Sequence, residues 1–187
     1  MKPFDYVMVL MSFVYGLAIA HILATFGDLI SATKRLRFSW LNAAWMLFSL
    51  LSVVAWWIGL WDLRGTLAWS MGEVGILFVA AAILYLQARL TCLRVPLDGI
   101  VDLAAFHREE GWKYMLAFAI QMSYAVLVNV LYVGAQTVNQ QNLAVSVMTI
   151  APIAAAIFKT RLVQVTVVLI VGSMLAWYFA ALQLPLN

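Results

Sequence analysis

Six long apolar segments, separated by short polar connections, constrain the fold of this chain more than any other feature. They cover residues 4–30, 38–61, 69–93, 112–133, 143–158 and 162–184. A bilayer core about 30 Å thick takes roughly 20 apolar residues per helix, so 187 residues have room for six spans. The fifth segment is the shortest and contains Pro152, so a helix there must tilt little or lean on its neighbours. The sequence predicts an all-α integral membrane protein with a single six-helix transmembrane domain over residues 1–187.

The composition excludes the other broad classes of protein. Apolar residues make up 66% of the chain and charged residues 10%, against about 25% charged in an ordinary soluble domain. A mean hydropathy of +0.98 excludes a disordered chain. The single cysteine, Cys92, cannot form an intrachain disulfide, and no Cys/His spacing indicates a metal or a redox cofactor. We therefore expect the lipid bilayer as the main partner, with no cofactor, no metal and no nucleic acid.

The basic residues predict the orientation of the spans, because Lys and Arg in short loops stay in the cytoplasm. Nine of the eleven fall in the first, third and fifth connections or beside them: Lys34, Arg35, Arg37, Arg89, Arg94, Arg108, Lys113, Lys159 and Arg161. Only Lys2 and Arg64 lie on the other side. We expect both termini on the non-cytoplasmic side, and the compact chain favours a bacterial inner membrane.

The third connection is the longest and has a pattern of its own. Leu97, Ile100, Val101 and Ala104 recur at helical spacing, and Asp98 is placed to cap a helix. This pattern predicts a short amphipathic helix on the cytoplasmic membrane surface. Such a helix either docks a partner or gates a path, or it is a connector that keeps its apolar side out of water.

Ionisable and amide side chains inside the spans are the candidate functional groups, because each is costly in lipid. His21, Thr25 and Asp28 share one face of the first span. Gln121 lies at about the same depth as His21, since both are about nine residues, or roughly 13 Å, from the cytoplasmic end of their spans. We predict a polar contact between them; a structural hydrogen bond between helices is the alternative.

A second polar pair is predicted near the outer ends of the spans. Glu73 lies about four residues inside the third span, and Asn129 lies at the matching depth of the fourth. Together with the inner group they suit a path for a proton or a small solute. The alternative for Glu73 is simple exposure to water at the membrane surface.

Small residues recur every fourth position along the first span, namely Ser12, Gly16, Ala20 and Ala24. This pattern lets two helix backbones approach closely. The predicted neighbour is another span of the same chain or a second subunit.

The resulting hypothesis is a transporter or channel for a proton, ion or small solute, with a polar path through the bundle. The alternative is a membrane scaffold, assembly or signalling subunit that docks a partner through Asp102, His107 and Glu109. The run from His107 to Glu110 is expected to be solvated. No residue is assigned a catalytic role, and an enzyme acting on a lipid through Asp98, His107 or Glu109 is the third possibility.

Overall fold

The computed structural model describes residues 3–65, 68–132 and 140–181 of the chain. Its elements are α1 (Pro3–Ser31), η1 (Thr33–Arg35), β1 (Leu36–Arg37), α2 (Trp40–Gly59), η2 (Leu60–Gly65), α3 (Met71–Thr91), β2 (Val101–Asp102), α4 (Leu103–Tyr132), α5 (Gln140–Ile157) and α6 (Arg161–Ala181). The predicted ends of the fourth and sixth spans, at residues 133 and 184, lie outside the described residues, as does most of the connection 134–142.

The expectation of an all-α membrane protein is confirmed at this level. Five of the described helices are long and apolar enough to cross a membrane, and the apolar part of α5, Asn142–Ile157, is shorter, as predicted. Pro152 lies inside α5. Two helix starts follow from capping side chains: the Ser39 hydroxyl accepts from the backbone of Asn42, and Ser70 and Glu73 form a capping box.

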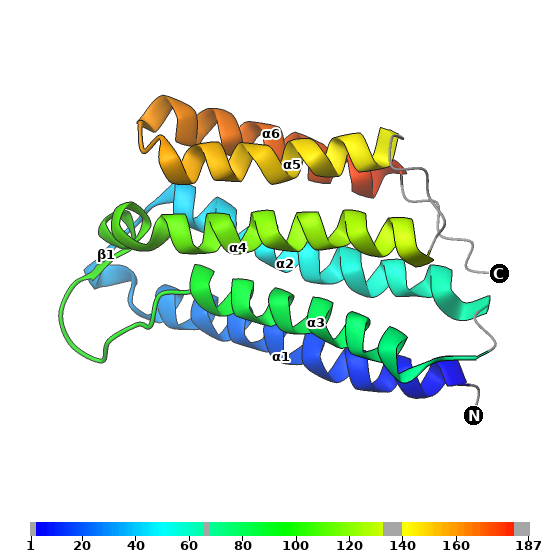
Figure 1. Ribbon diagram of the computed structural model, residues 1–187. Coiled ribbons are helices and arrows are strands. Elements are labelled where there is room, and N and C mark those ends of the chain that lie inside the picture. Colours follow the sequence, from blue (N-terminus) through cyan, green and yellow to red (C-terminus); the bar gives the residue numbers. More distant parts are fainter. Residues whose placement is uncertain (1–2, 66–67, 133–139, 182–187) are drawn as a thin grey trace.

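The helices form three pairs stacked in layers (Figure 1). In one outer pair α1 lies beside α3, the middle pair is α2 and α4, and α5 with α6 forms the other outer pair. The connections α1–α2, α3–α4 and α5–α6 meet at one end of the bundle, which we call the basic end. The first residues of α1 and the last of α6 lie at the opposite end, the terminal end.

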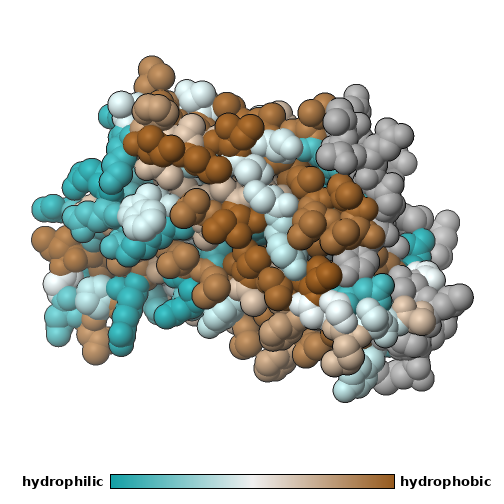
Figure 2. All heavy atoms as spheres, viewed as in Figure 1, coloured by the Kyte–Doolittle hydropathy of each residue, from teal (hydrophilic) through white to brown (hydrophobic). Residues whose placement is uncertain are grey.

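Hydrophilic and hydrophobic side chains are segregated along the bundle axis (Figure 2). Hydrophilic residues gather at the basic end, whereas hydrophobic residues cover most of the middle of the visible face. Many large apolar side chains of the helices are exposed, for example Leu131, Ile150 and Leu169. An apolar belt of this kind is what a bilayer covers.

The predicted amphipathic helix in the third connection is wrong. Residues 97–100 are not helical, and β2 pairs in parallel with β1, so that Leu36 lies opposite Val101. The helix begins only at Leu103 and continues into the fourth span. Gly99 has a φ of +87°, a backbone conformation that only glycine adopts readily, so the chain turns here instead of winding into a helix.

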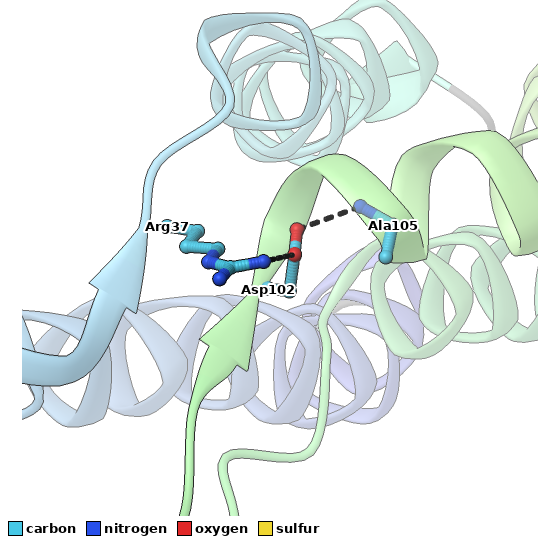
Figure 3. Close-up of polar contacts among 3 residues, drawn as sticks. All are labelled: Arg37, Asp102 and Ala105. Atoms are coloured by element: carbon cyan, nitrogen blue, oxygen red, sulfur yellow. Dashed lines mark hydrogen bonds and ion pairs between the residues drawn. The ribbon is translucent and has the colours of Figure 1, made fainter.

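Asp102, and not Asp98, caps this helix (Figure 3). Its carboxylate accepts from the backbone N–H of Ala105 at 2.8 Å and from the Arg37 guanidinium at 3.3 Å. The Ala105 hydrogen bond, helped by Arg37, holds the pKa of the Asp102 carboxyl below its usual range. One carboxylate thus fixes the start of α4 and ties it to the connection that follows α1.

Two apolar clusters form the interior, and α2 contributes to both. One lies among α1, α2 and α3 and includes Tyr15 and Leu84; the other lies among α2, α4, α5 and α6 and includes Phe118 and Val171. Trp45 on α2 is 1% exposed, and its ring contacts the rings of Phe48, Tyr114 and Phe118 at centroid distances of 5.5 to 5.9 Å. The middle layer is therefore where the polar side chains described next become enclosed.

The small-residue stripe of α1 mostly faces away from the rest of the chain. Gly16, Ala20 and Ala24 are exposed, and a Cβ atom added to Gly16 would meet nothing within 4 Å. Ser12 alone meets another span, because its hydroxyl accepts from Trp57 Nε1 at 3.1 Å. The close approach of two spans of this chain along the stripe, one of its two predicted uses, is not formed.

Candidate functional site

One face of α2 carries a row of buried uncharged polar side chains. Asn42, Ser49 and Ser52 follow one another at helical spacing, and each is at most 1% exposed. This face points into the middle of the bundle, towards α3 and α4, because Trp45 on the same face contacts α4. Three polar groups are thereby enclosed along the axis of an otherwise apolar helix.

Side chains of α3 complete a hydrogen-bonded layer with this face. The hydroxyls of Ser49 and Thr91 lie 3.0 Å apart, and Gln87 Nε2 donates to Ser49 Oγ at 3.0 Å. Asn42 Nδ2 donates to the Thr91 carbonyl at 3.3 Å, and the Thr91 hydroxyl donates to the Gln87 carbonyl at 2.7 Å. These contacts join α2 to α3 through polar groups in the bundle interior.

Gln121 on α4 lies at about the depth of Ser49, at one end of this layer. The rings of Trp45 and Phe118 are 5.5 Å apart, and α2 and α4 both run from the basic end. Ser49 is four residues beyond Trp45 and Gln121 three beyond Phe118, about 6 and 4.5 Å further along their helices. We call Asn42, Ser49, Gln87, Thr91 and Gln121 the polar layer.

The polar layer is incompletely hydrogen-bonded within the described residues. Asn42 Oδ1, Gln87 Oε1 and both side-chain polar atoms of Gln121 are buried and have no partner among these residues, and the same holds for Ser52 Oγ. Buried polar groups are normally paired with protein or with ordered water, so each such atom calls for an explanation. The layer therefore has free capacity for water or for a polar solute.

A pocket of about 140 Å³ lies on the side of the terminal end and begins at Ser52, three residues beyond Ser49 on α2. It is lined mainly by apolar side chains of α2 to α6, including Met122, which follows Gln121 in the chain. Its polar lining comprises Ser52, Asn129 and Tyr178. Small-molecule sites have this character, with apolar walls and a few placed polar groups.

A buried histidine lies towards the basic end of the same interior. His107 is 8% exposed, and its Nδ1 is hydrogen-bonded to the hydroxyl of Tyr114, which lies beside the Asn42 side chain. Gln164 on α6 lies beside the imidazole. The expectation that the whole run from His107 to Glu110 is solvated is wrong for His107, because the helix that begins at Leu103 turns this side chain inward.

The polar layer, the pocket and His107 lie along the middle of the bundle and share one chemical character. Their polar groups are amides, hydroxyls and one imidazole. Among the described residues, no Asp, Glu, Lys or Arg side chain is fully buried. The described part of the chain also holds no group of three His, Cys, Asp or Glu side chains that could bind a metal ion.

The predicted contact between His21 and Gln121 is not formed. The His21 ring nitrogen Nε2 lies 3.2 Å from Arg89, whereas Gln121 has no partner among the described residues. The reason is the helix arrangement, because α1 packs mainly on α3 and α2, and α4 mainly on α5 and α3. Thr25 is buried but donates to the carbonyl of His21 on its own helix, and Asp28 is exposed.

The second predicted pair, Glu73 with Asn129, has other partners. Glu73 Oε2 accepts from the backbone N–H of Ser70 at 2.7 Å, which makes it a helix cap. Asn129 Nδ2 donates to the Asn142 side chain on α5 at 3.3 Å. Of the six predicted path residues, Gln121 and Asn129 lie in or beside the interior site, and the other four lie elsewhere.

Five polar residues of this interior were not predicted from the sequence, although signals for them are present: Asn42, Ser49, Ser52, Gln87 and Thr91. The three α2 residues lie on one helical face, and Gln87 and Thr91 are four residues apart on α3. These uncharged stripes give a weaker sequence signal than ionisable groups do, because ionisable groups are more costly in lipid.

Comparison of the chain with known protein families, curated proteins and solved structures finds no match.

Proposed function

We propose that this membrane protein passes a small uncharged polar solute between the pocket at the terminal end and His107 at the basic end. The observation that carries the proposal is the set of buried polar atoms without partners in the polar layer and at Ser52. An unsatisfied buried polar group costs about 1–3 kcal/mol, and stable proteins have only about 5–15 kcal/mol in total. Water or solute in the layer removes this cost.

The chemistry of the site favours an uncharged solute over an ion. Amide and hydroxyl groups both donate and accept hydrogen bonds, so they can replace the water around a neutral polar molecule. A fully dehydrated ion in this interior would have no opposite charge beside it, and charges in lipid are strongly unfavourable without one. A proton is the alternative transported species, because the imidazole of His107 is a group that titrates near neutral pH in general.

The orientation belongs to the same proposal. The basic end carries the connections with most of the Lys and Arg residues, so it faces the cytoplasm by the positive-inside rule. The pocket then lies nearer the other side, which is the periplasm if the protein lies in a bacterial inner membrane.

The proposal is tested with purified protein in liposomes. Shrinkage and re-swelling after a jump in urea, glycerol or sucrose concentration are followed by light scattering, and proton entry is followed with a pH-sensitive dye. Passage of one of the small solutes, but not of sucrose, is the expected result. Proton flux without solute flux would mean that the protein transports protons instead of the solute. If neither flux exceeds that of empty liposomes, the proposal is refuted.

Matched variants connect the flux to the polar layer. Thr91→Val and Ser49→Ala remove hydroxyls from the layer, whereas Thr149→Val and Ser146→Ala remove hydroxyls that donate only to carbonyls of their own helix, α5. We expect the first two variants to lose most of the flux and the two controls to keep it. Equal flux in all four variants would contradict a path through the layer.

A surface at the basic end supports the alternative function, docking of a partner protein. Arg35 donates to the carbonyls of Pro96 and Gly99 at 2.7 and 3.0 Å, which holds the connection in place. Leu97 and Ile100 on this connection are 94% and 61% exposed.

If docking is the function, a partner protein is recovered with the purified wild type in stoichiometric amounts, and Leu97→Ser abolishes this recovery. Thr91→Val does not.

A further inference from the structure

Arg89 occupies an unusual position for a charged side chain. It lies in the last turn of α3, within a segment apolar enough to span a membrane, and it is exposed on the surface of the bundle. Its neighbours along this helix surface are also exposed, with Leu86 at 57% and Leu90 at 38%. The guanidinium therefore emerges beside exposed apolar side chains.

His21 on α1 is the neighbour of this guanidinium. Arg89 Nη1 lies 3.2 Å from His21 Nε2. Arginine only donates hydrogen bonds, so Nε2 is the acceptor and the imidazole carries its proton on Nδ1. The pair therefore has one net positive charge and a second N–H donor on the ring.

No described carboxylate neutralises this charge. The two ion pairs of the described residues, Arg37 with Asp102 and Lys113 with Glu110, do not include Arg89. Asp28 is seven residues beyond His21 on α1, about 10 Å further along the helix axis. Most of the five N–H donors of the guanidinium remain available for an anion.

We propose that Arg89 and His21 bind the phosphate of an anionic phospholipid in the leaflet at the basic end. A guanidinium matches the geometry of a phosphate through two parallel hydrogen bonds. Phospholipid phosphate is the anion present at the end of a spanning helix, and Leu86 and Leu90 provide an apolar surface for its acyl chains. The site is separate from the polar layer, so it does not depend on the proposed solute path.

The test measures lipid preference in nanodiscs that contain the full chain. Retention of phosphatidylglycerol relative to phosphatidylcholine is counted by native mass spectrometry for the wild type, Arg89→Gln and Arg94→Gln. Arg94 is the control because it is exposed and lies in the connection after α3. The diffuse attraction of one arginine to an anionic surface gives about a fivefold preference, and charge-assisted hydrogen bonds to a phosphate add to it, so we expect Arg89→Gln to lose more than about fivefold and Arg94→Gln to lose no more than that.

Two results of the lipid-preference measurement would overturn the proposal. One is a wild-type preference in Arg89→Gln, and the other is an equal loss in Arg94→Gln, which indicates a diffuse basic surface. If Arg89→Gln fails to fold, His21→Leu is measured instead, and it should weaken the preference while retaining the charge. Melting temperatures in the two lipids provide a second readout. If Arg89 only stabilises the end of α3, Arg89→Gln lowers the melting temperature equally in both lipids. That result would also overturn the proposal.

Discussion

Replacement of Gln121 by methionine distinguishes a dry interior from a hydrated one. Methionine has nearly the same size and shape, so the change removes two polar atoms and leaves the volume almost unchanged. Gln121 is 1% exposed, and neither polar atom has a partner among the described residues. In a dry layer, removal of an unpaired buried amide raises the free energy of unfolding by about 1–3 kcal/mol.

The proposed function predicts a different result for Gln121→Met. If water or solute already pairs with the amide, the substitution removes hydrogen bonds of ordinary strength, about 0.6 kcal/mol each inside a membrane protein. The free energy of unfolding should then stay unchanged or fall slightly, and solute flux should drop. The assay is reversible unfolding in mixed micelles beside flux in liposomes. A variant that is stabilised by 1 kcal/mol or more and has undiminished flux would refute the reasoning.

Two further predictions concern packing and pH. The Gly172→Ala variant should be less stable than the Gly16→Ala variant by about 1–3 kcal/mol. The methyl group added at Gly172 meets the ring of Phe48 at 3.3 Å, and Trp45 limits the movement of that ring. The methyl group added at Gly16 enters open space. Equal stabilities in thermal unfolding would contradict the packing described here. Asp102 stabilises the fold when ionised and has a lowered folded pKa, so its contribution is present above its ordinary pKa of about 3.9 and is lost as the pH falls through the lower folded value. Asp102→Asn, which retains a capping oxygen, should lack this part of the acid destabilisation in a pH series of melting temperatures, and an unchanged pH profile would argue against the capping role.

The helices themselves could be predicted from the sequence because lipid imposes one strong requirement. Each span must be long, apolar and internally hydrogen-bonded, and this is visible as runs of residues without knowledge of any neighbour. The described helices agree with the six predicted segments to within a few residues, apart from the earlier start of α4 at Leu103. That start depends on Asp102 and its contact with Arg37, which lies 65 residues away in the chain.

The candidate site could be predicted only in part, because depth along a helix says nothing about which helices are neighbours. His21 and Gln121 were matched in depth, yet they lie on helices that do not pack closely together. Gln121 instead lies level with Ser49. The sequence supplies the position of each polar group along the membrane normal, and the packing of the three layers determines which groups meet.

The sequence by itself determined the class of the protein, the apolar segments and the end of the bundle where positive charge collects. Only the tertiary structure decided which side of each helix faces the interior. In a soluble protein hydropathy marks the buried face, but here both lipid and interior are apolar, so Gly16 on the surface and Ala81 in the core look alike in sequence. The polar layer became recognisable when packing brought α2, α3 and α4 together.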